Sequence, residues 1–312
     1  MLKIYLICLS FLFLLNIESA RCDPHYKFNM DANGWLKVHQ IPATWEEAFL
    51  RCHYEGAVLA SPLTQQLSKA IENKFSDISC YSQSIHLGIH DLYSTGDFVT
   101  VEGVPLESLM LKWSSFKSTG DCFAMSRDGR SFMTKCTESR PYVCYKKLDN
   151  LTMNICGTFD DAYRLNEKTG SCYKRHWQLM TWPDAYKICA AEGGYLVILN
   201  DATEAAIVRD MFPIRPGKAN DWENFHVGLR AWGPERTWIT IHGERIEDVF
   251  HDWNPGQPDN YMGIQNSGSF IRLGTLDDHA SDKKSMFVCE KDPKVKRFEE
   301  VPEGLSEALG QY

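Results

Sequence analysis

Oxygen-bearing side chains gather in one stretch towards the C-terminal end of the sequence. Trp253–Tyr261 reads W-N-P-G-Q-P-D-N-Y, and within it Gln257 and Asp259 flank a proline. Their side chains converge if the Gln257–Pro258 bond is cis, an isomer that is found almost only before proline. Calcium takes about six to eight oxygen ligands, mainly from carboxylates and amide carbonyls. This stretch is therefore a candidate for one side of a calcium site.

Three more oxygen donors follow along the chain. Gln265 lies eight residues beyond Gln257, and Asp277 and Asp278 stand together just before the last predicted strand. With Gln257 and Asp259 they make five candidate calcium ligands. The alternative is a solvated acidic turn that binds no ion, because Q-P-D by itself is a turn tripeptide that also arises by chance.

An internal repeat shows which elements must position these residues. Matched positions in the two copies are 137 residues apart in the first part of the repeat, beginning with Lys37 and His39. From Gly88/Gly228 to Trp113/Trp253 they are 140 residues apart. A repeat of this kind predicts two copies of one domain, joined near residues 145–155. The first set of matched positions is Trp45, Ala48, Cys52, Gly56 and Leu59, which recur as Trp182, Ala185, Cys189, Gly193 and Leu196.

Each copy predicts the same order of elements. A threonine that can cap a helix precedes an apolar face at i, i+3, i+4 and i+7, and a glycine follows it. A short strand, a second helix and a loop-rich region with short strands come next, which together make an α+β fold. The expected helices cover 44–54, 62–75, 181–191 and 202–212, and the expected strands include 58–60, 196–199, 142–145 and 287–290.

This framework resembles the C-type lectin domain. The residues that carry the likeness are a helix ending in C-x-x-E-G, a strand H-[LV]-G-[IL], a tryptophan and a final F/Y-V-C strand. Two such domains after a signal peptide resemble the immulectins, dual-domain lectins of lepidopteran haemolymph. The resemblance implies two tandem domains, each with two helices, short antiparallel sheets and a long irregular loop region. The implied boundaries are 23–148 and 156–292, with a linker at 149–155 and a tail at 293–312.

The N-terminal 22 residues have the pattern of a signal peptide. Lys3 precedes an apolar run over 4–15 and a short polar stretch. Cleavage fits best before Asp23, and almost as well after Ser19. A secreted, extracellular protein is expected, and no later run is long enough to predict a membrane span. A signal that stays attached as an anchor is the alternative.

The resemblance also implies how the cysteines pair. The pairs are Cys52–Cys144, Cys122–Cys136, Cys156–Cys172 and Cys189–Cys289, and serine stands at both positions, Ser267 and Ser281, of one pair in the second copy. Cys80 is left over; it is free, links two chains, or pairs with Cys22 if the signal is cut earlier. Asn150 begins the N-x-[ST] sequon of the expected linker, so glycosylation is expected there.

The same resemblance assigns roles to the candidate ligands. Gln257 and Asp259 fall on the E-P-N or Q-P-D motif of sugar-binding members, Gln265 on the glutamate that follows, and Asp277 and Asp278 on W-N-D. The resemblance implies that Gln257, Asp259 and Asp277 also contact sugar. In the family, Q-P-D favours galactose-like hydroxyls, and Tyr261 lies where galactose-type members often stack an aromatic ring on the sugar.

The first copy lacks these features. The interval from its tryptophan to the next framework position is 9 residues, Trp113 to Cys122, against 14 from Trp253 to Ser267. Residues 131–133 read S-F-M where the second copy has L-D-D, so they supply no carboxylate. We expect no calcium binding at this place in the first copy.

Composition excludes several other classes of function. The net charge of −8 argues against a nucleic-acid partner, and we find no nucleophile–base, H-E-x-x-H or phosphate-loop motif that would indicate an enzyme. The resemblance implies a calcium-dependent lectin that recognises microbial glycans or lipopolysaccharide in innate immunity, and it leaves a homo-oligomer open. The rival interpretation is a calcium-independent, protein-binding lectin-like module of the venom or salivary type.

Overall fold

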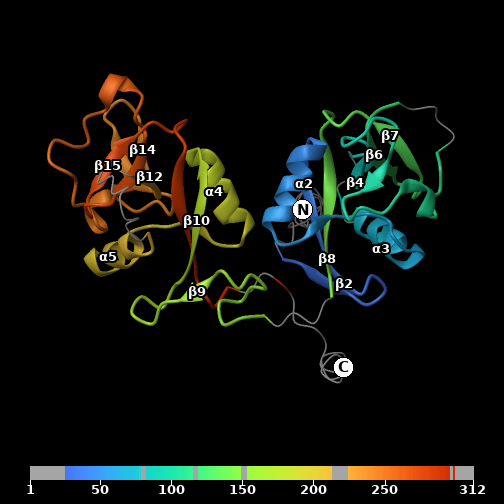
Figure 1. The fold of residues 1–312 in the computed structure, drawn as a ribbon, viewed down its shortest axis with the longest axis horizontal. Coiled ribbons are helices and arrows are strands. Elements are labelled where there is room, and N and C mark those ends of the chain that lie inside the picture. Colours follow the sequence, from blue (N-terminus) through green and yellow to red (C-terminus); the bar gives the residue numbers. More distant parts are fainter. Residues whose placement is uncertain are drawn as a thin grey trace, which may run out of the picture. The chain divides into compact units, whose positions relative to one another are not determined.

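The structure is a computed structural model that describes residues 25–76, 78, 82–114, 119–148, 153–212, 224–295 and 298. The expected signal peptide, Cys80, Asn150 and nearly all of the expected tail lie outside these residues. The described chain forms two compact units (Figure 1). The first contains the described residues up to Ala48 and those of Leu59–Tyr145, and the second contains Phe49–Val58 and the described residues from Lys146 onward.

The first unit is built on one mixed sheet. Its strand order is β1-β2-β8-β4-β6-β7, in which β4 and β8 run parallel, whereas β1 and β2, β4 and β6, and β6 and β7 run antiparallel. Two short strands lie off this path, β3 beside β8 and β5 beside β4. The elements in chain order are β1 (Lys27–Asn29), β2 (Gly34–Ala43), α2 (Trp45–Tyr54), β3 (Val58–Leu59), α3 (Gln65–Ser76), β4 (Ser84–His90), β5 (Val99–Thr100), η1 (Leu106–Ser108), β6 (Cys122–Ser126), β7 (Ser131–Thr134) and β8 (Arg140–Lys147).

The second unit repeats this topology. Its sheet has the order β15-β14-β12-β16-β10-β9, again with one parallel pair, β12 and β16. Two copies of one α+β fold are therefore confirmed. The elements are β9 (Arg164–Leu165), β10 (Cys172–Met180), α4 (Trp182–Ala191), β11 (Tyr195–Leu196), α5 (Ala202–Asp210), β12 (Asn224–Trp232), β13 (Thr237–Thr240), η2 (Ile246–Asp248), η3 (Tyr261–Gly263), β14 (Ser267–Ile271), β15 (Leu276–His279) and β16 (Ser285–Lys291).

The first helix of each copy forms where the sequence predicts it. Thr181 caps α4, because its hydroxyl accepts the backbone N–H of Asp184. Trp182, on the buried face of α4, donates from its indole nitrogen to the carbonyl of Val227 at 2.8 Å. Trp45 makes the matching bond to the carbonyl of Leu87 at 2.7 Å. The repeated tryptophan thus fixes each helix to the central strand, β12 or β4.

Other boundaries differ slightly from the sequence prediction. Helix α3 begins at Gln65, three residues after the expected start at residue 62, because Thr64 caps it through the N–H of Leu67 at 3.1 Å. Strand β11 covers Tyr195–Leu196, whereas the sequence predicts 196–199, and Asn200 beyond it donates to Glu204 of α5.

Disulfides join elements that are distant in the sequence. The bond between Cys189 and Cys289 ties α4 to β16 across 100 residues, and the bonds Cys122–Cys136 and Cys156–Cys172 close shorter loops. Closing the 100-residue loop between Cys189 and Cys289 removes about 4–5 kcal/mol of chain entropy from the unfolded state. Cys52 and Cys144 are disulfide-bonded as well.

The core of the second unit lies between α5 and the sheet. It contains Val208 of α5, Phe225 of β12, Phe270 of β14 and Val288 of β16, all at most 1 % exposed. Burial of such side chains stabilises each by roughly 1.5–3 kcal/mol. Strand β15, which carries Asp277 and Asp278, and its neighbour β14 are anchored to this core through Leu276 and Phe270.

One glycine in each central strand is required by the fold. A Cβ added to Gly228 would lie 2.5 Å from the carbonyl oxygen of Leu196, and the same addition to Gly88 would come closer still to that of Leu59. The Gly228 N–H donates to Val197 at 2.7 Å, and the Gly88 N–H to Ala60 at 2.9 Å. These positions therefore need glycine so that two backbones can meet.

Candidate functional site

The loop that carries Gln257 and Asp259 connects β13 to β14 in the second unit. Its start is fixed to β15, because Asn254 donates to the carbonyl of Leu276 at 2.8 Å and Leu276 donates back to Asp252 at 2.8 Å. The Trp253 ring packs on Trp238, with centroids 5.0 Å apart. The loop is thus held beside the two aspartates that follow Leu276.

Asp278 is the centre of the loop's hydrogen bonding. Its side chain has no exposure to solvent, and its two oxygens accept the N–H groups of Asp259 at 3.1 Å and Asn260 at 2.9 Å. Oδ2 also pairs with the guanidinium of Arg236 at 2.7 Å. A buried carboxylate is stable only when it is bonded and paired in this way. Asp278 therefore joins β15, the Q-P-D turn and the end of the β12–β13 connection.

The side chains of the two glutamines form hydrogen bonds within the same loop or to β15. The amide nitrogen of Gln265 donates to the Asp278 carbonyl at 2.7 Å, and its amide oxygen accepts the N–H of Tyr261. The amide oxygen of Gln257 accepts the N–H of Asp259 at 2.9 Å. The Gln257–Pro258 bond is cis. Gln257, Asp259, Gln265 and Asp278 are thus brought together by direct hydrogen bonds.

Asp277 is the ligand candidate with an unused oxygen. Its Oδ1 is buried and has no hydrogen-bond partner among the described residues. Burial, followed by the charges of Asp278 and Asp259, raises the pKa of Asp277 to about 6. An orphaned carboxylate oxygen beside two other acids suits a cation. The donor set, three carboxylates and two amide oxygens, is one that calcium accepts.

The acids of the loop are nevertheless spread out. In the described part of the chain, groups of three or more His, Cys, Asp or Glu ligand atoms within 4.8 Å of one another occur at His39–Glu55–Cys144 and at His176–Glu192–Cys289. Both cysteines are disulfide-bonded, so neither group offers a thiolate. The loop acids share hydrogen bonds but do not make such a group by themselves.

Arg236 is the residue at the candidate site that sequence reasoning missed. Besides its ion pair with Asp278, its guanidinium donates to the carbonyl of Gln265 at 2.8 Å and lies 5.4 Å from the Trp238 ring centroid. Its backbone is left-handed, with φ of 52°. Only the copy comparison could have pointed to it: 140 residues earlier the first copy has Gly96.

Tyr261 lies at the outer side of the loop. Its N–H donates to Asp259 Oδ1 at 3.0 Å, while the side chain is 67 % exposed. The ring is therefore available to a ligand, and the backbone fixes its position next to the Q-P-D turn.

The first unit keeps the backbone pairing between the tryptophan and the neighbouring strand, but it lacks the candidate ligand residues. Trp113 pairs with Ser131 as Trp253 pairs with Leu276, and Ser114 donates to the Ser131 carbonyl at 2.9 Å. Strand β7, which corresponds to β15, reads S-F-M-T and carries no acid.

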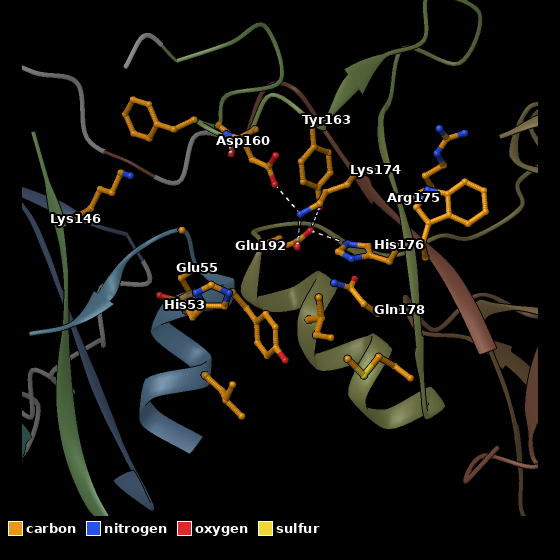
Figure 2. A pocket seen from close by; sticks show the side chains of 18 of the residues that line it. His53, Glu55, Lys146, Asp160, Tyr163, Lys174, Arg175, His176, Gln178 and Glu192 are labelled. Atoms are coloured by element: carbon orange, nitrogen blue, oxygen red, sulfur yellow. Dashed lines mark hydrogen bonds and ion pairs between the residues drawn. The ribbon is translucent and has the colours of Figure 1, made fainter. Parts of the chain in front are cut away.

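A second polar cluster explains two repeated motifs. Glu192, at the end of α4, bonds to Lys174 at 2.6 Å, to Tyr163 at 3.0 Å and to His176 at 3.2 Å (Figure 2). Lys174 also pairs with Asp160 at 2.7 Å, and although burial lowers the Lys174 pKa, these two acids raise it above its usual value. Four of these residues have identical counterparts 137 positions earlier, namely Tyr26, Lys37, His39 and Glu55. The K-x-H and C-x-x-E-G motifs therefore belong to the framework of each copy.

Comparison with known proteins places both copies in one family. The sequence profile of the lectin C-type domain matches residues 41–146 and 178–291. A hemolymph lipopolysaccharide-binding protein of Periplaneta americana is 34% identical over 133 residues, which are 41% of this chain and 52% of that protein. Lymphocyte antigen 75 of Mesocricetus auratus is 24% identical over 288 residues, 88% of this chain and 16% of that protein.

The chain spans about half the length of the cockroach protein and a smaller share of the hamster protein. Among solved structures, the C-type lectin CEL-I of Cucumaria echinata aligns with 42% of this chain and 95% of its own, at 21% identity and a TM-score of 0.37. Within the described residues, no helix has the length and apolarity needed to cross a bilayer.

Proposed function

Because the chain belongs to the C-type lectin domain family, we propose that it is a secreted, calcium-dependent lectin of innate immunity. Its second unit would bind microbial surface sugars, including lipopolysaccharide, with a preference for galactose-type hydroxyls. One observation carries the proposal. Five oxygen-bearing side chains lie on strand β15 and on the loop that is hydrogen-bonded to it, and a buried oxygen of Asp277 lacks a partner among the described residues. The similarity to a lipopolysaccharide-binding haemolymph protein supports the immune role.

Gln257, Asp259, Gln265, Asp277 and Asp278 would hold calcium in this proposal. The bound ion would supply a coordination site for two neighbouring sugar hydroxyls. The side chains would do the rest: Asp259 would accept hydrogen bonds from the sugar, and Gln257 would offer both a donor and an acceptor. The exposed ring of Tyr261 would pack against the apolar face of the sugar.

A second candidate is a calcium-independent, protein-binding module. The observation that favours it is the ion pair between Arg236 and Asp278, which already neutralises the buried carboxylate. The loop would then be a fixed surface for a protein partner, and sugar binding would be absent.

Chromatography of the full-length secreted chain separates the two candidates. We expect retention on immobilised galactose in millimolar calcium, elution by a chelator or by free galactose, and little elution by mannose. Retention that survives excess chelator would remove the calcium dependence. No retention on galactose, mannose or lipopolysaccharide columns would favour the protein-binding module.

A further inference from the structure

We infer that Arg236 is a built-in counter-ion that competes with calcium for Asp278 and so sets the calcium affinity of the second unit. This inference rests on the proposed function, since it concerns the regulation of the same site. The residue acts through Asp278 and has no sugar contact of its own in this proposal.

Arg236 makes two polar contacts with the candidate site. It lies 2.7 Å from Asp278 Oδ2, the most buried of the acids, and 2.8 Å from the backbone oxygen of Gln265. Its guanidinium also lies over Trp238, and only 22% of its side chain is exposed. A guanidinium that has a fully buried carboxylate partner and a fork of donors is held much more firmly than one in a surface ion pair.

The electrostatics set arginine and calcium in opposition. A buried Asp278 with no cation beside it would be costly, so in the ion-free protein Arg236 stabilises the loop. When a divalent cation approaches the same carboxylate, the guanidinium repels it and must share or give up Oδ2. Calcium therefore has to displace an existing ion pair, which weakens its apparent binding.

The two copies support the pairing of these residues. The position that matches Arg236 is Gly96, with the offset of 140 shared by Trp113 and Trp253. Strands β7 and β15 match with an offset of 145, so Met133 corresponds to Asp278. The second copy therefore has both Arg236 and Asp278, and the first copy has neither the arginine nor the aspartate.

The test is calcium titration of the full-length chain by calorimetry, together with thermal unfolding with and without calcium. We expect Arg236→Gln to lower the melting temperature of the ion-free protein and to tighten calcium binding about tenfold. Arg245→Gln is the matched control, because Arg245 pairs with Glu247 at an exposed site of the same unit. It should change neither quantity. Arg236→Lys, which keeps the charge but loses the fork, should tighten calcium binding by less, and it serves as the variant if Arg236→Gln does not fold.

The outcomes separate this inference from the proposed function. Unchanged or weaker calcium binding in the Arg236 variants, with measurable binding by the native chain, would overturn the inference alone. Binding by Arg236→Gln but not by the native chain would support the inference and remove the calcium dependence of the native protein. If no chain takes up calcium at several millimolar, both are wrong.

Discussion

At the scale of single residues, the two acids Asp259 and Asp278 have different tasks. Asp278 is fully buried and bonds to two backbone N–H groups of the turn, so its removal would also open the loop. Asp259 is exposed, and its side chain makes a local bond to the N–H of Tyr261. Asp259 is therefore the cleaner probe of ion binding.

We predict that Asp259→Ala lowers calcium affinity at least tenfold and abolishes retention on galactose, while the ion-free protein stays within about 1 kcal/mol of native stability. Calorimetric titration and thermal unfolding check the two halves. The exposed Asp282→Ala is the control and should behave as the native chain. Equal loss in both variants would mean that general negative charge, and not this ligand, matters.

We predict that Glu290 of β16 makes the stability of the second unit depend on pH. It is 1% exposed, and burial, followed by the charge of Glu204, raises its pKa to about 7. Because the folded state holds this proton more tightly, the stabilisation is complete below the unfolded pKa, about 4.3, and is lost as the pH rises through 7. The loss amounts to about 3–4 kcal/mol.

The comparison of native protein with Glu290→Gln isolates this effect. We expect urea unfolding at pH 5 to 8 to show that the native protein loses stability relative to the glutamine variant as the pH rises. The buried His86 and His226, whose pKa values burial lowers to about 4, act in both proteins and cancel in the difference. Parallel pH curves for the two proteins would contradict the prediction.

At the scale of elements, the β14–β15 hairpin matches β6–β7 in register. Cys122 pairs with Thr134 in the first unit as Ser267 pairs with His279 in the second. Cys136 and Ser281 both lie two residues further on. The first hairpin has its disulfide with a Cα–Cα distance of 5.1 Å, whereas Ser267 donates to the His279 carbonyl at 2.9 Å.

We predict that Ser267→Cys with Ser281→Cys forms a disulfide and raises the stability of the second unit by about 3 kcal/mol. A restrained hairpin should also tighten calcium binding, because less of the loop has to be ordered by the ion. Thiol counting, thermal unfolding and calcium titration test this, with each single cysteine variant as a control. Two free thiols in the folded double variant would show that the serine hairpin has a different side-chain geometry.

The same elements show how far the sequence could lead. The helices follow from local signals, the capping threonines and the apolar face that Trp182 shares with Cys189, so their ends were predicted to within a few residues. The ligand candidates came from spacing along one stretch. Arg236 was missed because its role depends on a left-handed backbone and on a partner 42 residues away, which no local pattern encodes.

At the scale of the whole molecule, the two copies share a topology but differ in the loop. We predict that a fragment of about residues 153–292 binds calcium and galactose, with a calcium dissociation constant of about 10⁻⁴–10⁻³ M, as in extracellular modules. A fragment of about 23–148 should bind neither. Calorimetry on the two fragments is the measurement, and circular dichroism is the control for folding. Calcium uptake by the first fragment would show that the first copy also has a calcium site, or that the site was assigned to the wrong copy.

The close backbone approach at Gly88 and Gly228 has a consequence for mutational tolerance. Each glycine packs against a carbonyl in a way that leaves no space for a side chain, and this holds in the copy with the ligand loop and in the copy without it. In a saturation library selected only for secretion, both positions should be depleted of every variant, whereas Asp259 should accept many. Selecting the same library on immobilised sugar should add Asp259 to the depleted positions and leave the score of Gly88 unchanged. The difference between the two selections would then separate residues that make the fold from residues that bind the ligand.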